Sequence, residues 1–173
     1  MKHRKKLIIS VTLLAILLVG YLVPEKLVIP VEGASQSDWN AESFWYEPWG
    51  KSGVHKGIDI FSAKGTRLNS SSQGLVLFTG NLALGGKVVL VLGPKWKLHY
   101  YAHLDSVSVG SFSFVKTGEQ IGSIGDSGNA KGKPPHLHYS IVSVVPRVWR
   151  VDSATQGWKK MFFLDPGKEI SHS

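Results

Sequence analysis

Short apolar runs separated by turn residues dominate the chain after residue 38, and they limit its possible folds more than any other feature. No stretch of useful length there has the 3.6-residue apolar spacing of an amphipathic helix. Instead, β-branched and aromatic runs alternate with Gly, Ser, Asn and Pro, which is typical of strands joined by tight turns. The clearest runs are residues 75–79, 87–92, 97–103, 120–124 and 137–145. We therefore expect residues 39–165 to form an all-β domain, an antiparallel barrel-like or sandwich structure.

The N-terminus predicts a membrane segment, residues 1–23. A basic cluster at residues 2–6 precedes an uncharged apolar run from residue 7 to residue 23. As a helix this run would be roughly 25 Å long, at the short end of what spans a bilayer. Basic flanks stay in the cytoplasm, so the domain would face the periplasm or extracytoplasmic space. The alternatives are a cleaved signal peptide, which would release the domain there, and a buried core helix. The run is long for the apolar region of a signal peptide. It is also apolar on every face, which argues against a core helix, so we expect a signal anchor.

Composition limits the remaining segments and the class of partner. Residues 24–38 contain two prolines and a patch of small polar residues, so we interpret them as a spacer, and residues 166–173 as a polar tail. The formal net charge is +8, but part of it lies in the N-terminal cluster and the remainder is scattered. Because no RRM-like or helix-turn-helix pattern accompanies it, we expect no nucleic-acid partner.

The chain contains no cysteine, which excludes a disulfide scaffold, a thiolate metal site and a cysteine nucleophile. Any metal must therefore be bound by His, Asp or Glu. Of the seven histidines, His3 belongs to the basic leader and His172 to the predicted tail. The other five lie between residues 55 and 138 and are the candidates for chemistry.

Two short motifs offer metal ligands. His55 and Asp59 stand where a turn enters a predicted strand, and imidazole nitrogen and carboxylate oxygen both bind zinc. His136 and His138 open the last strong strand, where alternation places both on one face with Leu137 on the other. Each motif alone is common on protein surfaces. Together they form a nitrogen and oxygen ligand set typical of catalytic zinc, which keeps three protein ligands and an open position for water.

A third motif leaves two candidates open. If residues 97–103 form a strand, His99, Tyr101 and His103 share a face. His99 and His103 would then lie roughly 13 Å apart, so both cannot easily serve one metal centre. The spacing alone favours neither of them.

These motifs occur in the order and approximate spacing of the lysostaphin-type, or LytM-type, zinc endopeptidases that cut peptidoglycan peptides, and the chain resembles that family over about residues 53–145. The resemblance rests on HKGIDI from residue 55, YAHL from residue 101, the turn-rich segment 115–135 and the closing HLH from residue 136. Three separated motifs in order are far more specific than any one of them.

The resemblance implies a site and an activity. His55, Asp59 and His138 would bind Zn²⁺, and His103 and His136 would be the catalytic histidines, which favours His103 over His99. It also implies an antiparallel β fold of the duplicated hybrid motif type with a groove over the metal. The substrate would be peptidoglycan, hydrolysed at amide bonds of its peptide stems or cross-bridges, outside a cytoplasmic membrane that the N-terminal helix contacts.

Three alternatives accompany this interpretation. A non-catalytic member of the family would activate or recruit another wall hydrolase, but such members typically lose metal ligands, which this chain keeps. A biotinyl or lipoyl carrier domain is suggested by residues 115–125, but no lysine stands in a suitable turn. An unidentified regulatory protein could direct the activity in place of the anchor.

An aromatic group precedes the first motif and could cover the groove, although we favour a role in packing: Trp39, Phe44, Trp45, Tyr46 and Trp49.

Overall fold

The computed structural model describes residues 2–171, so His172 and the end of the predicted tail lie outside the described residues. Two helices are present in this part of the chain, α1 (Lys2–Leu22) and α2 (Pro166–Ser171). The strands are β1 (Ile58–Phe61), β2 (Arg67–Asn69), β3 (Gly74–Leu82), β4 (Gly86–Leu92), β5 (Lys97–Val107), β6 (Phe114–Val115), β7 (Gln120–Ile124), β8 (His136–Ser143) and β9 (Phe163–Leu164).

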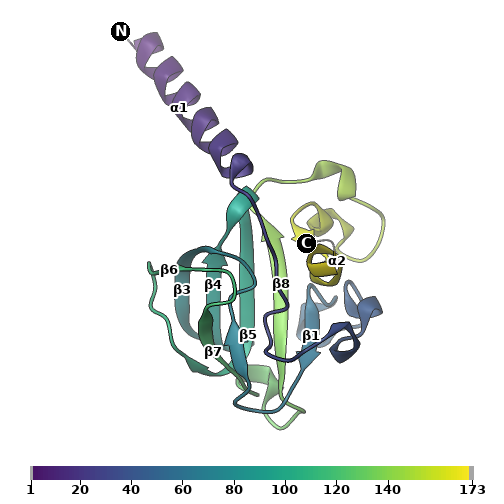
Figure 1. Cartoon of the computed structure of the whole chain (residues 1–173). Coiled ribbons are helices and arrows are strands. Elements are labelled where there is room, and N and C mark those ends of the chain that lie inside the picture. The colour runs from purple at the N-terminus through teal and green to yellow at the C-terminus, as the bar shows by residue number, and fades with distance from the viewer. Residues whose placement is uncertain (1, 172–173) are drawn as a thin grey trace.

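The described strands form one antiparallel sheet in the order β1-β8-β5-β4-β3-β6 (Figure 1). The first half of β5 pairs with β8, and its second half pairs with β7, which in turn pairs with β2. A short edge strand, β9, continues the sheet beyond β8. The predicted all-β antiparallel fold with an N-terminal apolar helix is confirmed, and each of the five predicted runs overlaps a strand.

Strand alternation separates a buried face from a face that lines a groove. On β8, Leu137, Tyr139 and Ile141 are fully buried in the core, and Ile58 and Ile60 of β1 join them. The alternate residues of the same strands line a groove of about 1180 Å³. The sheet therefore places two of the motifs found in the sequence side by side on its groove face.

Helix α1 extends away from the domain (Figure 1). Its stretch His3–Leu22 has a mean hydropathy of 2.0, and its most apolar part is not buried in the structure. This excludes a buried core helix, whereas the choice between an anchor and a signal peptide stays a prediction. The helix touches the domain at the 3₁₀ turn Pro94–Trp96, where Trp96 Nε1 donates to the Leu17 carbonyl over 2.9 Å.

The segments expected to be a spacer and a polar tail pack against the domain instead. Leu27 and Val31 are buried in the core, and the Val28 N–H donates to the Ser71 carbonyl over 3.0 Å. At the other end of the chain, Ile170 of α2 is buried in the same core. The prolines at positions 24 and 30 indicated a spacer, although residues 27–31 form a short apolar run, and Ile170 stands alone in a polar stretch without periodicity.

A buried ion cluster links three distant parts of the chain. The Lys97 ammonium group, at the start of β5, lies 2.6 Å from a carboxylate oxygen of Glu25 and 2.5 Å from one of Glu169. Glu25 follows α1 and Glu169 belongs to α2. The cluster therefore ties the segment after α1 to the sheet and to the C-terminal helix α2.

Candidate active site

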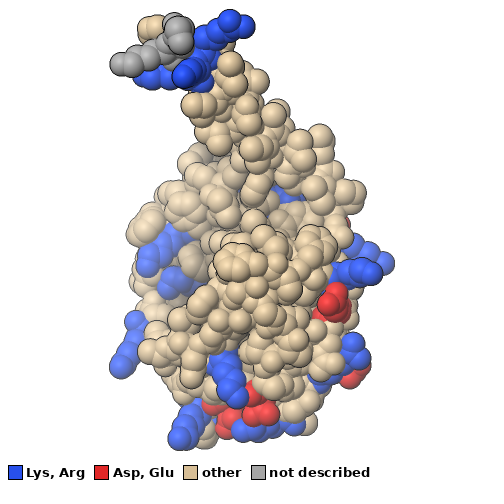
Figure 2. Space-filling view, turned by 90° about the vertical axis from the view of Figure 1, so that its left-hand side faces the viewer, with Lys and Arg blue, Asp and Glu red and all other residues tan. Residues whose placement is uncertain are grey.

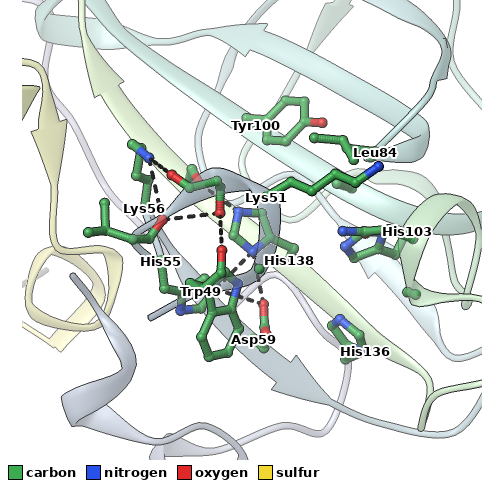
Figure 3. A pocket seen from close by; sticks show the side chains of 18 of the residues that line it. Trp49, Lys51, His55, Lys56, Asp59, Leu84, Tyr100, His103, His136 and His138 are labelled. Carbon is green, nitrogen blue, oxygen red and sulfur yellow. Dashed lines mark hydrogen bonds and ion pairs between the residues drawn. The ribbon is translucent and has the colours of Figure 1, made fainter. Parts of the chain in front are cut away.

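The three predicted metal ligands come together on the groove face (Figure 3). Asp59 of β1 and His138 of β8 are direct partners in the antiparallel register, so their side chains are neighbours. His138 Nδ1 lies 2.9 Å from Asp59 Oδ1, and His55 Nε2 lies 3.1 Å from the same oxygen. His55 Nε2 and His138 Nδ1 are 3.0 Å apart. Ligands of one tetrahedral zinc ion lie roughly 3.3 Å apart, so this triangle has the size that a metal requires.

The second nitrogen of each imidazole has a partner that orients the ring. His55 Nδ1 lies 2.9 Å from the Ser43 carbonyl, which can only accept, so Nδ1 carries the proton and Nε2 offers its lone pair. His138 Nε2 lies 3.0 Å from Ser140 Oγ, two residues along the same face of β8. Such outer partners fix the tautomer and orientation of metal-binding histidines.

His55 is held by the chain that precedes it. The Trp45 N–H donates to the His55 carbonyl over 2.7 Å, and the His55 N–H donates to the Tyr46 carbonyl over 2.9 Å. Trp49 stacks on the imidazole with ring centroids 4.0 Å apart. These contacts bury His55 and set it opposite the two strands.

Asp59 carries a negative charge that the site stabilises. Burial alone would raise the pKa of its carboxyl group, but the neighbouring His138 and His55 side chains outweigh this effect and hold the pKa well below its ordinary value of 3.8. A carboxylate beside two imidazole nitrogens is a ligand set that suits Zn²⁺.

A β-bulge decides which histidine of β5 reaches the groove. Tyr101 pairs with Val89 and Leu104 with Lys87, so β5 contains an extra residue at this point, and His103 has a left-handed backbone with φ of +68°. The bulge turns His103 to the groove face, where its ring centroid lies 5.0 Å from that of His136. The expectation that His99, Tyr101 and His103 share a face is therefore wrong.

His99 instead belongs to the core. Its ring is fully buried, and its Nδ1 lies 2.7 Å from the Tyr139 hydroxyl. His136 and His138 lie on one face with Leu137 on the other, as alternation predicted.

The two remaining histidines of the groove have their Nδ1 atoms engaged by backbone carbonyls. His103 Nδ1 lies 2.9 Å from the Ser127 carbonyl, and His136 Nδ1 lies 2.8 Å from the Pro134 carbonyl. Each Nδ1 therefore carries a proton, which leaves Nε2 available. Burial lowers the pKa of His103 to about 4, so this imidazole is neutral near pH 7.

The aromatic group before the first motif divides between packing and the groove. Trp39 is buried in the core, and Trp45 packs edge-on against Phe163 with ring centroids 6.1 Å apart. Trp49 lines the groove next to His55, on the side away from Leu84 and Tyr100 (Figure 3). Packing is thus the role of some members, while Trp49 forms part of the groove wall.

Sequence reasoning missed the groups that support the histidines. The position of Ser140 could have been predicted, because it follows His138 by two residues and so lies on the same face of the strand. The carbonyls of Ser43, Ser127 and Pro134 had none, since any residue type supplies a carbonyl. Their positions depend on loop conformations.

Comparison with known proteins then places the chain in a family. The model of peptidase family M23 matches residues 53–149, more than half of the chain and all five histidine and aspartate residues of the groove. The chain belongs to peptidase family M23. The chain is 34% identical over 115 residues to the L-Ala--D-Glu endopeptidase of Bacillus subtilis, covering 61% of this chain and 35% of the relative.

Other similar proteins have different descriptions. The chain is 32% identical over 105 residues to the murein hydrolase activator NlpD of Escherichia coli, covering 60% of this chain and 27% of NlpD. The catalytic domain of lysostaphin from Staphylococcus simulans matches with a TM-score of 0.57 and 26% identity, covering 72% of this chain and 85% of that domain. The chain thus spans about a third or less of the length of these two curated relatives. The resemblance inferred from the motifs is confirmed.

Proposed function

We propose that this protein is a zinc-dependent endopeptidase that hydrolyses amide bonds in the peptide stems or cross-bridges of peptidoglycan, outside the cytoplasmic membrane. One observation carries the proposal: the donor atoms of His55, Asp59 and His138 lie within 3.1 Å of one another, beside two histidines with an available Nε2.

The chemistry of the donor set fits zinc. Two imidazoles and one carboxylate converge, and both imidazoles have an outer partner on their other nitrogen. When bound by His55, Asp59 and His138, Zn²⁺ supplies a Lewis acid that polarises a carbonyl group and lowers the pKa of water.

His103 and His136 are proposed to handle the protons. Amide hydrolysis requires removal of a proton from the attacking water and delivery of one to the leaving nitrogen. A neutral imidazole whose Nδ1–H is engaged accepts a proton at Nε2, and the imidazolium so formed donates it again or stabilises the oxyanion of the tetrahedral intermediate. The carbonyls of Ser127 and Pro134 keep both rings in the tautomer that this exchange needs.

A second candidate is an activator of another wall hydrolase, favoured by the similarity to NlpD. The two functions make different demands on the groove. An activator needs no complete ligand set, whereas hydrolysis needs the metal and both free histidines. We infer hydrolysis because the described groove retains all five residues.

The location is proposed from α1. Its length and apolar composition suit a single membrane span, and the basic residues at its start would stay in the cytoplasm. The domain would then act on peptidoglycan from the outer side of the membrane.

The test uses the full chain in detergent, with purified cross-linked peptidoglycan as substrate. Digests contain zinc or a chelator, and released fragments are identified by mass spectrometry. The variants are His138→Ala and, as a histidine control in the leader, His3→Ala. We expect cleavage by the wild type and by His3→Ala with zinc, and none by His138→Ala or with chelator.

Zinc content measured on the same samples separates the outcomes. Cleavage without zinc would contradict the proposed metal dependence. Stoichiometric zinc with no cleavage would favour the activator, and adding a separate wall hydrolase would then show whether the protein stimulates it.

A further inference from the structure

We propose that the segment 144–162, which connects β8 and β9, is a membrane-contact surface that lays the domain against the bilayer spanned by α1. This inference rests on the proposed membrane location of α1 and is independent of the peptidase activity.

The segment exposes an unusual amount of apolar surface. Trp149 is 78% exposed, Val148 63% and Trp158 55%. Val144 and Val151 are exposed as well. Because exposed apolar groups of this size are unfavourable in water, a cluster of them in one segment indicates a contact surface.

The polar residues of the segment suit a lipid interface. Arg147 and Arg150 flank Val148 and Trp149, and the Lys159 ammonium group lies 5.5 Å from the Trp158 ring centroid. The one acidic residue of the segment, Asp152, is paired with Lys160. Trp is enriched at membrane interfaces, and long basic side chains extend from an apolar surface to lipid headgroups. A surface of Trp and Val interleaved with Arg therefore matches the boundary between headgroups and acyl chains.

The segment lies at the end of the domain where α1 joins it (Figure 1). Hydrogen bonds connect the two: the Val144 N–H donates to the Trp96 carbonyl over 2.9 Å, and Trp96 Nε1 donates to the Leu17 carbonyl of α1. Figure 2 views the left-hand side of Figure 1, not the side of the segment, and there acidic side chains gather mainly at the end of the domain away from α1. The two hydrogen bonds thus connect the apolar surface of α1 to the end of the domain that carries the segment.

The segment is held in shape rather than free to adapt. The Arg147 N–H donates to the Met161 carbonyl over 2.8 Å, which brings together the 3₁₀ turns Val148–Arg150 and Gly157–Met161. Gln156 Nε2 donates to the Ser52 carbonyl, and Trp45 Nε1 donates to the Thr155 carbonyl. Since residues 45–56 carry Trp49 and His55, docking this surface on a bilayer would orient the groove relative to the membrane.

The absence of native cysteine allows a direct test with single nitroxide labels on the full chain in nanodiscs of phosphatidylcholine and phosphatidylglycerol. Labels are placed by Trp149→Cys in the segment and by Leu14→Cys in α1. The matched control is Phe112→Cys, because Phe112 is also 78% exposed but precedes β6 at the opposite edge of the sheet. Collision with oxygen, which concentrates in lipid, is compared with collision with a water-soluble nickel chelate.

We expect the labels at positions 14 and 149 to favour oxygen and the label at position 112 to favour the nickel chelate, by several-fold in the ratio of the two rates. A label at position 149 that matches position 112 overturns the docking surface while the anchor stands. A water-exposed label at position 14 overturns the anchor and the inference that rests on it. Protection of position 149 from both reagents would identify a protein contact instead and also overturn the inference.

Discussion

Burial and a single carbonyl set the chemical state of His103. A solvent-exposed imidazole is partly protonated near neutral pH, whereas the pKa of His103 is lowered to about 4. The Ser127 carbonyl then selects the tautomer with a lone pair on Nε2. His103 is therefore prepared to accept a proton before any substrate arrives.

His103→Ala should lower kcat by two orders of magnitude or more, because it removes a proton-transfer group but no metal ligand. The measurement is turnover of purified peptidoglycan together with the zinc content of the protein. Zinc content should stay unchanged. A fully active variant would rule out this role for His103.

The buried His99 makes the fold sensitive to acid. Burial, and secondarily the charge of Lys97, lowers the pKa of His99 to about 3, whereas the unfolded chain has a value near 6.5. The unfolded state therefore binds the proton more readily, and stability falls as the pH drops from about 6.5 toward 3.

The contribution of His99 to this slope is at most ~1.4 kcal/mol per pH unit. His99→Gln should reduce the pH dependence of the free energy of unfolding, measured by urea titration of the full chain in detergent between pH 4 and pH 7. Asp59 and His103 are present in both the wild type and the variant, so their contributions to the pH dependence cancel when the two proteins are compared. Parallel curves for the two proteins would contradict the prediction.

At the scale of elements, close contact between two turns positions Ser127. A side chain at Gly128 would meet the Gly86 nitrogen at 2.3 Å and the Leu84 carbonyl oxygen at 2.4 Å, and Gly128 has a φ of +68°. The turn between β3 and β4 is thus packed against the turn after β7. This contact holds the carbonyl that orients His103.

Gly128→Ala should reduce both stability and kcat, because the turns must separate and the Ser127 carbonyl must move. Gly132→Ala is the matched control: Gly132 has a φ of +79° with no atom near its missing side chain. The control should lose about 1–2 kcal/mol from backbone strain alone and keep its kcat. Equal losses of stability and activity in both variants would show that the contact between the turns is unimportant.

The facing of side chains was predictable from the sequence where they alternate regularly along an uninterrupted strand. Alternation along β8 placed His136 and His138 correctly, since the strand is regular over both. The same rule misplaced His103, because a bulge adds a residue to β5 and no residue type marks it. The choice between His99 and His103 came from the family resemblance rather than from spacing. The structure shows its physical basis in the left-handed backbone at His103.

At the scale of the whole molecule, the ion cluster around Lys97 connects both ends of the chain to the sheet. The Lys97 and Glu25 side chains are 4% and 6% exposed, so the charges depend on each other rather than on water. Removing one partner of a buried pair leaves an uncompensated charge.

Lys97→Met should therefore lower the free energy of unfolding by ~3–5 kcal/mol, and Lys97→Met with Glu25→Gln should recover part of the loss. Lys64→Met is the control, because it removes an exposed ion pair with Asp126 and should change stability little. Urea unfolding in detergent provides the measurement. A loss in Lys97→Met no greater than in the control would show that the cluster does not stabilise the fold.

The packing of residues 24–38 on the sheet also determines how far the groove can travel. A free linker of that length would add roughly 20 Å of reach. Here those residues pack against the core instead. With α1 in a bilayer, the groove would therefore lie at a fixed distance from the membrane surface. For the proposed wall hydrolase, the search for substrate would then be two-dimensional, by diffusion in the plane of the membrane, and the dimensions of the domain would set the layer of wall within reach.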